Sequence, residues 1–226
     1  MPGVFIGARS GEDRAAIIIA ASGEVVDIAI LGATGKTGRH VVSIALERGH
    51  RVRALARRPP DEQKEGVTYL PANIESVSEI TRLVDGCEAV ISALGPSRDR
   101  VDVCSTATGT LLAAGIKRLI IVSGAGIGVP GDKKDAVGRI VSVMVRLLSP
   151  AAFRDKQLEY AKLAASSADW TLARAPRLVD SPPRGTLKVS VERALGNQLS
   201  RQALAAFCVD EAETPRYVRQ APFVSE

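Results

Sequence analysis

The stretch Ile28–Gly38 reads IAILGATGKTG and decides the fold of this chain. It begins inside a short apolar run, which predicts a buried strand. Three glycines follow at a regular spacing: Gly32, Gly35 and Gly38. A helical repeat of apolar residues then covers Lys36–Glu47, and Gly49 is placed to end that helix. The order of strand, glycine turn and helix start predicts a cradle for phosphate groups, because a helix N-terminus carries unpaired N–H groups and a partial positive charge.

Each glycine of this turn has its own expected role. Gly32 would permit the tight turn, Gly35 would let the backbone approach a pyrophosphate, and Gly38 would let the helix pack closely on the strand. This context favours dinucleotide binding over the alternative, a tight turn without a ligand. The letters GKT also resemble the end of a P-loop, but that motif needs a glycine five residues before Gly35. Ile30 stands there, so a P-loop nucleotide hydrolase is disfavoured.

Length and composition are those of an ordinary globular chain. The 226 residues suffice for one α/β domain with a sizeable core, and 46% are hydrophobic while 24% are charged. The net charge of +5 suits an anionic ligand but does not indicate nucleic-acid binding. The three cysteines lie far apart without metal-binding spacing, so we expect reduced thiols, no metal site and a cytoplasmic location.

Residues 1–24 precede the first predicted strand, and no role is assigned to them. Their apolar run, Ala15–Ala21, is too short to span a membrane and follows two acidic residues, which do not fit a signal peptide. We therefore expect no membrane partner. The predicted organisation is an N-terminal extension of unknown role over residues 1–24, followed by an NAD(P)-binding Rossmann domain over residues 25–226.

The end of the second predicted strand distinguishes between two dinucleotides. Arg51–Ala56 is predicted to form this strand, and Arg57 and Arg58 follow it directly. A cofactor with a free ribose 2′-hydroxyl would need an acidic residue here, whereas the first acid in this chain is Asp61. Two arginines suit a 2′-phosphate and favour NADP(H). The alternative is a pair of solvated arginines before a Pro-Pro turn.

Strands and helices alternate along the rest of the chain. Further strands are predicted at Val67–Leu70, Glu88–Ala93, Lys117–Val122 and Asp169–Arg174, with β-like segments at Thr186–Val191 and Arg216–Gln220. Helices are predicted at Ser76–Val84, Asp102–Ala114, Arg154–Ser167 and Ser200–Val209. An apolar helical stripe at Ala136–Leu148 is typical of core or of a subunit contact, which permits a monomer or a homodimer. The alternation predicts an α/β fold: a single doubly wound Rossmann domain with a parallel sheet and helices on both faces.

At four places the chain resembles the atypical short-chain dehydrogenase/reductases, and within them the NmrA-like, NAD(P)H-binding group. These places are the turn Gly32–Gly38, the strand end at Arg57, the strand end at Ser123 and the letters DWTL at residues 169–172. The biliverdin-IXβ reductase/flavin reductase type is the most similar. The resemblance extends from Val26 to the carboxyl terminus and implies a single Rossmann domain that binds NADP(H).

The resemblance also implies which residues contact the cofactor. The pyrophosphate would lie on the glycine turn, at Thr34, Gly35, Lys36 and Thr37. The 2′-phosphate would lie on Arg57. The other implied contacts are Asn73 and Ile74 on the adenine side, where Asn replaces the usual Asp, Leu94 and Gly95 after the fourth strand, Ser123 near the nicotinamide, and Pro176 in the loop that closes over it. Ala93 joins this set because residues at the carboxyl ends of parallel strands line the ligand crevice.

The chain lacks the Tyr-x-x-x-Lys pair with which many short-chain dehydrogenases transfer protons. Ala152 stands four residues before Lys156, and Ala164 stands four residues after Tyr160. Neither of the two histidines is well placed for acid–base chemistry. A reductase can nevertheless orient a nicotinamide beside an easily reduced planar acceptor, because the cofactor carries the chemistry and protons can come from solvent.

Two residues remain candidates for a catalytic role. Ser123 can donate a hydrogen bond to substrate or nicotinamide, or it can bond a neighbouring backbone group. Lys156 can reach the ribose or the substrate, or it can be an exposed helix lysine paired with Glu159 or Tyr160. Arg174 and Arg177 are expected to flank the mouth of the site, where they attract an anionic acceptor or remain solvated.

Two functions from different classes fit these observations. The first is an NADPH-dependent oxidoreductase that transfers hydride to a small-molecule acceptor that is planar and conjugated, such as a flavin, a quinone or a tetrapyrrole-like compound. The second is a non-catalytic NADP(H)-sensing regulatory protein of the NmrA-like type, which the missing Tyr–Lys pair leaves open. An epimerase or isomerase is less favoured, because it too would need an acid–base pair.

Overall fold

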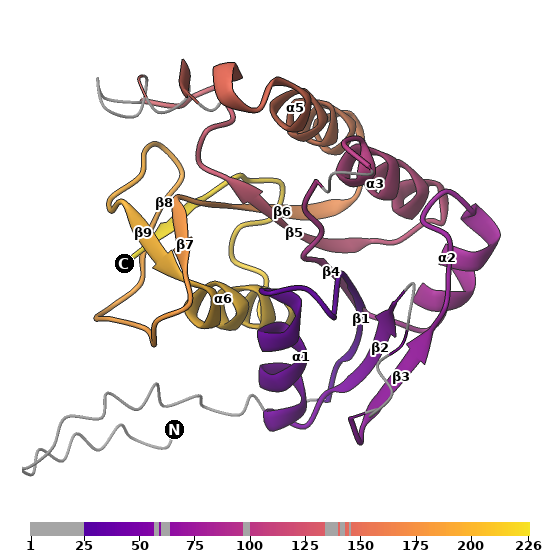
Figure 1. Cartoon of the computed structure of the whole chain (residues 1–226). Helices are drawn as coiled ribbons and strands as arrows, with labels where there is room; N and C mark the ends of the chain where they lie inside the picture. Colours follow the sequence, from indigo (N-terminus) through magenta and orange to yellow (C-terminus); the bar gives the residue numbers. More distant parts are fainter. Residues whose placement is uncertain are drawn as a thin grey trace, which may run out of the picture.

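The computed structural model describes residues 25–56, 59, 64–96, 100–133, 140, 143–144 and 146–226. The described strands are β1 Asp27–Leu31, β2 Arg51–Leu55, β3 Val67–Leu70, β4 Ala89–Ser92, β5 Arg118–Gly124, β6 Asp169–Ala175, β7 Arg177–Val179, β8 Lys188–Ser190, β9 Gln198–Ser200 and β10 Phe223–Ser225. The labelled helices are α1 Gly38–Glu47, α2 Val77–Val84, α3 Val103–Ala113, α5 Pro150–Ala165 and α6 Arg201–Glu213. One large sheet has the order β3-β2-β1-β4-β5-β6-β10-β8, and β7 pairs with β9 in a small second sheet (Figure 1).

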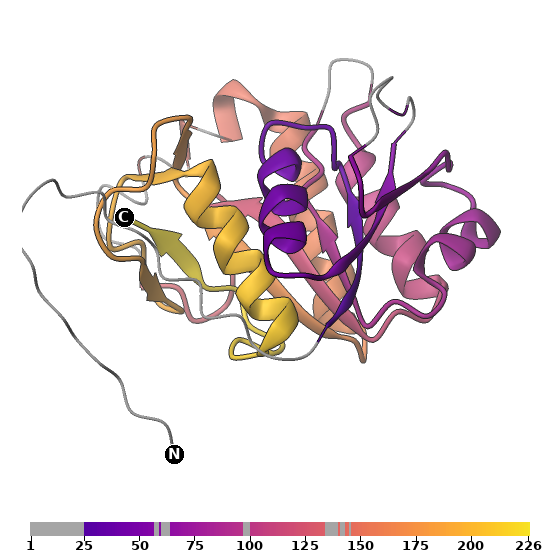
Figure 2. The same cartoon turned by 90° about the horizontal axis from the view of Figure 1, so that it is seen from below.

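Helices cover both faces of the large sheet, as Figures 1 and 2 show. Helices α1 and α6 pack on one face, and α2, α3 and α5 pack on the other. Successive side chains of a strand point to opposite faces. In β1, Ile28 and Ile30 join the core beneath α1, whereas Ala29 and Leu31 join the core beneath α2 and α3. The continuous apolar run is therefore that of a strand buried on both sides, and the predicted α/β Rossmann fold is confirmed.

The strands β1 to β6 are parallel to their neighbours, so their carboxyl ends meet at one edge of the sheet. The carboxyl-terminal part departs from the predicted all-parallel sheet. Strand β10 is parallel to β6, but β8 runs antiparallel to β10. The large sheet is therefore mostly parallel, with one antiparallel strand at its edge.

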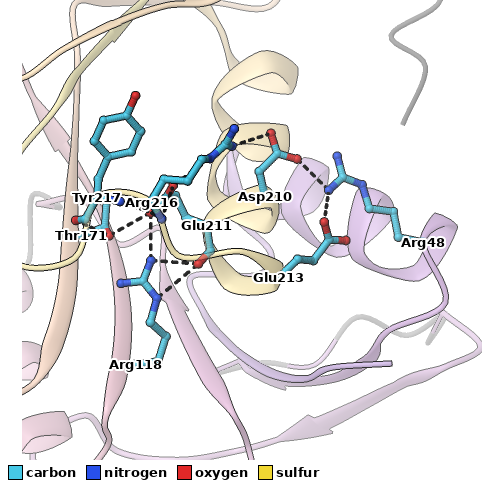
Figure 3. A network of polar contacts seen from close by, with 8 residues as sticks. All are labelled: Arg48, Arg118, Thr171, Asp210, Glu211, Glu213, Arg216 and Tyr217. Carbon is cyan, nitrogen blue, oxygen red and sulfur yellow. Dashed lines mark hydrogen bonds and ion pairs between the residues drawn. The ribbon is translucent and has the colours of Figure 1, made fainter. Parts of the chain in front are cut away.

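The β-like segment predicted at Arg216–Gln220 is wrong except at its end, where Gln220 forms an isolated bridge with Thr171; the strand itself lies further along the chain, at β10. The backbone amides of Arg216 and Tyr217 donate to the buried carboxylate of Glu211, at 3.3 and 3.1 Å (Figure 3). Arg219 takes a left-handed φ of 55°, which is typical of a turn. A carboxylate from α6 thus replaces the backbone carbonyl acceptors that a neighbouring strand would have offered to these two amides.

Two predicted helices have different bounds in the structure. The helix predicted at Arg154–Ser167 is α5, which begins at Pro150, because the fixed φ of proline suits the first helical turn. The helix predicted at Ser200–Val209 is α6, which continues to Glu213. Ser200 caps α6, since its Oγ accepts a hydrogen bond from the Ala203 amide at 3.0 Å.

The apolar helical stripe predicted at Ala136–Leu148 lies partly outside the described residues. Its described apolar side chains are exposed, with Leu147 at 70% and Leu148 at 74%, so they are not core. A subunit contact there stays a prediction. Arg57, Arg58 and residues 1–24 also lie outside the described residues. Within the segments that the structure describes, no helix is long and apolar enough to cross a membrane.

Candidate functional site

The strand order creates a crevice at the carboxyl edge of the large sheet. Strand β1 lies between β2 and β4. The chain leaves β1 toward α1 on one face and leaves β4 toward α3 on the other face (Figure 1). Ligands of open α/β sheets bind at such a switch point, outside the carboxyl ends of the strands.

The glycine turn between β1 and α1 lies at this switch point. Gly32 has a φ of 77°, and the amide of Gly35 donates to the Gly32 carbonyl at 2.9 Å, which closes the turn. Helix α1 begins at Gly38 after Thr37, whose side chain makes no capping bond. Among the described residues, no acceptor is found for the amides of Lys36 and Thr37. These donors at the start of a helix are available to an anion.

Two of the glycines allow the turn to pack tightly against its neighbours. A Cβ at Gly38 would lie 2.0 Å from the carbonyl oxygen of Gly32. A Cβ at Gly32 would lie 2.9 Å from the carbonyl oxygen of Ala93, just beyond β4. Both obstructions are backbone atoms, which cannot rotate away. The turn is therefore held between the start of α1 and the end of β4, where only residues without a side chain fit.

A cavity of about 650 Å³ lies beside the turn. Its lining includes many of the residues predicted to contact the cofactor: Gly32, Thr34, Gly35, Asn73, Ile74, Ala93, Leu94 and Gly95. Of the other described candidates, Lys36, Thr37 and Gly38 belong to the same turn, and Ser123, Lys156 and Pro176 are not lining residues. The lining also includes residues that the sequence did not indicate as site residues: Leu55, Ala56, Pro71, Ala72, Glu79, Arg100 and Val103.

Glu79 brings a carboxylate to the lining near Asn73. The Asn73 amide donates to Glu79 Oε2 at 2.7 Å, and the Asn73 side-chain oxygen accepts from the Glu75 amide at 3.1 Å. Glu79 lies in the first turn of α2, where its own amide donates to Ser76 Oγ at 3.3 Å. The spacing S-x-x-E could have identified this capping arrangement in the sequence. A carboxylate from α2 thus lies beside Asn73 in the cavity lining.

Arg100 brings a positive charge to the same lining. Its guanidinium pairs with Glu75 at 2.9 Å and with Asp102 at 3.4 Å. The two carboxylates hold the guanidinium between the start of α3 and the loop before α2. No periodicity or motif marks Arg100 in the sequence, because only the fold brings this loop to the cavity.

Ser123 lies inside β5, which continues to Gly124, and not directly after the strand as predicted. Its side chain is buried, and its Oγ has no hydrogen-bond partner among the described groups. The alternative, in which the hydroxyl bonds neighbouring backbone, therefore finds no support in the described contacts. An unpaired buried hydroxyl is costly, so a ligand that bonds it gains free energy.

Lys156 is not an exposed helix lysine, because only 12% of its side chain is accessible. Its Nζ donates to the Val122 carbonyl at 3.0 Å and to Glu159 Oε2 at 2.9 Å. Burial lowers the pKa of Lys156, but the charge and hydrogen bond of Glu159 outweigh burial, and the net pKa lies above its usual value. The ammonium is therefore held, in its charged form, in a pair between α5 and β5.

The prediction that Arg174 flanks an open mouth is wrong, because its side chain is fully buried. Its Nε donates to the Ala221 carbonyl at 2.7 Å and its Nη1 donates to Asp132 at 2.8 Å. The guanidinium also lies 3.7 Å from the ring centre of Phe223 in β10. Strand β10 was not predicted, so its cover over Arg174 could not be foreseen. Arg177, at the start of β7, is exposed.

Several solved structures share this fold. An anaerobillin reductase from Escherichia coli O157:H7 is 22% identical with a TM-score of 0.74, over 88% of this chain and 97% of that chain. A Streptococcus pneumoniae protein with the provisional name NADH-flavin reductase is 22% identical with a TM-score of 0.71, over 89% and 99%. A short-chain dehydrogenase/reductase from Veillonella parvula, solved in complex with NADP, is 18% identical with a TM-score of 0.70, over 90% and 95%.

A family model described as NAD(P)H-binding matches residues 32–215. The match begins at the first glycine of the turn and ends just after α6, so it includes the cavity and both helical layers. The resemblance to NAD(P)H-binding proteins is thereby confirmed. The turn, the crevice and the family model agree, and the chain belongs to the NAD(P)H-binding family.

Proposed function

We propose that this protein is an NADPH-dependent reductase that transfers hydride to a small, planar, conjugated acceptor such as a flavin, a quinone or a tetrapyrrole-like compound. The observation that carries the proposal is the cavity of about 650 Å³ at the carboxyl ends of β1, β2 and β4, with the glycine turn in its wall. Its volume is in the range of small-molecule sites, about 300–1,000 Å³.

In this proposal the bound dinucleotide lies along the cavity. The amides of Lys36 and Thr37, together with Thr34 and the three glycines, bind the pyrophosphate. Asn73 and Ile74 lie at the adenosine half, and Arg57 and Arg58 bind the 2′-phosphate. The residues proposed along the nicotinamide half are Ala93, Leu94, Gly95, Ser123 and Pro176. The turn amides without an acceptor and the Ser123 hydroxyl without a partner among the described residues support this arrangement.

The chemistry asks little of the protein beyond orientation. The bound cofactor supplies the hydride. Ser123 Oγ would donate to the nicotinamide amide or to the acceptor and so hold the two at reacting distance. Lys156 is already bonded to Val122 and Glu159, so we propose that the acceptor takes its proton from solvent. Conjugated acceptors suit such a site, because their reduced forms spread charge over many atoms.

The names of two structural neighbours support the class of acceptor. Of these neighbours, one is named as a reductase of anaerobillin and the other has the provisional name NADH-flavin reductase. A second candidate function is a non-catalytic sensor of NADP(H). The buried Lys156–Glu159 pair favours it, because Lys156 is then already bonded and not available as a proton donor.

The two functions are separated by measuring binding and turnover together. NADPH and NADH are titrated calorimetrically, and loss of nicotinamide absorbance is followed with panels of flavins, quinones and biliverdins. Acceptor-dependent NADPH oxidation, reduced in Ser123→Ala, is the expected result. Tight NADPH binding without turnover on any acceptor would favour the sensor. Failure to bind either dinucleotide would contradict both functions.

Arg57→Ala is expected to weaken NADPH binding about tenfold or more while NADH binding changes little. A charge-assisted hydrogen bond to the 2′-phosphate is lost only in the first complex. Arg51→Ala is the matched control, because Arg51 starts β2 at the opposite edge of the sheet, where it pairs with Asp27. Calorimetric titration of both dinucleotides checks the result. An equal loss for NADPH and NADH would contradict the assignment of the 2′-phosphate to Arg57.

A further inference from the structure

A buried polar cluster connects α3 and α5 to the carboxyl ends of β4 and β5. We define this cluster as Cys104, Thr108, Lys156 and Glu159. Glu159 is fully buried, where Lys156 Nζ donates to its Oε2 at 2.9 Å and Thr108 Oγ1 donates to its Oε1 at 3.5 Å. The proposed function uses none of these groups for chemistry. Buried charges are expensive, so their presence beside the crevice calls for an explanation.

The cluster completes hydrogen bonds that the sheet leaves open. The pairing of β4 with β5 ends at Ser92 and Ile121. The amide of Ala93, the residue after β4, donates instead to the Leu31 carbonyl of β1, on the other side of β4 from β5. The Val122 carbonyl therefore lies beyond the last β4 partner, and it accepts from Lys156 Nζ at 3.0 Å. Without this donor, a buried carbonyl would be left unsatisfied.

The same cluster also holds the chain just after the end of β4. After β4 the chain separates from β5, and the Leu94 carbonyl accepts from Cys104 Sγ at 3.6 Å. Burial raises the pKa of the Cys104 thiol to about 12, although Lys156 acts in the opposite direction. The thiol therefore keeps its proton and remains a donor at neutral pH. One cluster thus holds Leu94 after β4 and Val122, next to Ser123, in β5.

We propose that this cluster is a positioning device that sets the separation of Leu94 and Ser123, and with it the placement of the nicotinamide half of the cofactor. Lys156 and Glu159 are then positioning residues, not catalytic ones. The adenosine half lies on other elements, so it does not depend on the cluster. This inference rests on the proposed function, which puts the nicotinamide at Leu94 and Ser123.

The test compares a whole cofactor with its adenosine half. In the double variant Lys156→Met/Glu159→Gln no lone charge is left buried, which avoids the main risk of misfolding. We expect NADPH affinity to fall about tenfold, as for the loss of one or two hydrogen bonds, while the affinity for adenosine 2′,5′-bisphosphate stays unchanged. Cys104→Ala, which removes the bond to Leu94 but leaves the Lys156–Glu159 pair in place, is expected to give a smaller loss with the same selectivity.

The matched control is Lys162→Met. Lys162 also joins α5 to α3, through a bond from its Nζ to the Ser105 carbonyl at 2.7 Å, but it touches neither strand end. Equal losses for both ligands, equal effects of the Lys162 and Lys156 variants, or unchanged NADPH affinity would each overturn the inference. Because the readout is binding, a protein without turnover still tests it. If the unmodified protein binds the bisphosphate but not NADPH, the proposed function fails, and the inference fails with it.

Discussion

Replacing Gly38 with alanine is expected to remove measurable NADPH binding and to lower the free energy of unfolding by about 3 kcal/mol. A Cβ at this position would lie 2.0 Å from the Gly32 carbonyl oxygen and 2.7 Å from its carbon. Because both atoms are backbone, the clash is relieved only by moving α1 away from the turn. That movement displaces the amides of Lys36 and Thr37, which we propose bind the pyrophosphate. Denaturant unfolding and calorimetric titration measure the two effects.

Gly49→Ala separates the clash from the general cost of replacing a glycine. Gly49 has a φ of 83°, so an alanine there is strained, by about 1–2 kcal/mol, but no atom of the described residues lies within 4 Å of the added Cβ. It ends α1 at the far side from the turn, so NADPH binding should be unchanged. If Gly38→Ala retained the NADPH affinity of Gly49→Ala, the glycine turn would not be the cofactor site.

The turn could be predicted because its determinants are local in the sequence. Gly32 has a positive φ, and a Cβ at this position would lie 2.9 Å from the Ala93 carbonyl oxygen. A glycine is therefore required. The flanking strand and helix follow from hydrophobic periodicity, which β1 and α1 both express. A site built on backbone geometry leaves such a signature in the sequence, and Gly32, Thr34 and Gly35 of the cavity lining were found through it.

The burial of Lys156 and Arg174 could not be predicted, because it depends on contacts between distant elements. Lys156 is buried because the Val122 carbonyl, 34 residues earlier, needs a donor. Arg174 is buried because β10, of only three residues, covers it with Phe223. Strands this short carry no readable periodicity, so neither the strand nor the burial of Arg174 is visible in the sequence.

The carboxyl-terminal error has the same origin in a tertiary contact. Glu211 accepts the amides of Arg216 and Tyr217, and it thereby turns a β-like segment into a loop (Figure 3). The β-propensity of Arg216–Gln220 was overridden by a buried carboxylate on the preceding helix. Hydrogen bonds to a side chain can replace a strand partner, and local sequence does not record where that side chain will be.

Glu211→Gln is expected to lower the free energy of unfolding by about 3 kcal/mol or more, although it barely changes the volume of the side chain. Glu211 is fully buried, and its Oε2 accepts from Arg118 Nη2 at 3.0 Å and from Thr171 Oγ1 at 3.2 Å (Figure 3). Burial lowers the pKa of Arg118, and Glu211 acts in the opposite direction. The amide would leave that guanidinium buried without its counter-charge. The NH₂ group of the new amide would also point at groups that themselves donate hydrogen bonds.

The neighbouring Asp210→Asn is the control that distinguishes a fully buried carboxylate from a partly exposed one. Asp210 accepts from Arg48 at 2.7 Å, and its side chain is 34% exposed; the Arg48 side chain is 5% exposed but keeps its pair with Glu213 at 2.9 Å. We expect a loss below about 1 kcal/mol, measured by denaturant unfolding at the same pH and ionic strength. Equal losses in the two variants would mean that the Glu211 network stabilises the fold no more than a partly exposed ion pair does. Because Glu211 lies at the amino ends of β5 and β6, away from the crevice, NADPH affinity should be the same in both variants wherever the protein is folded.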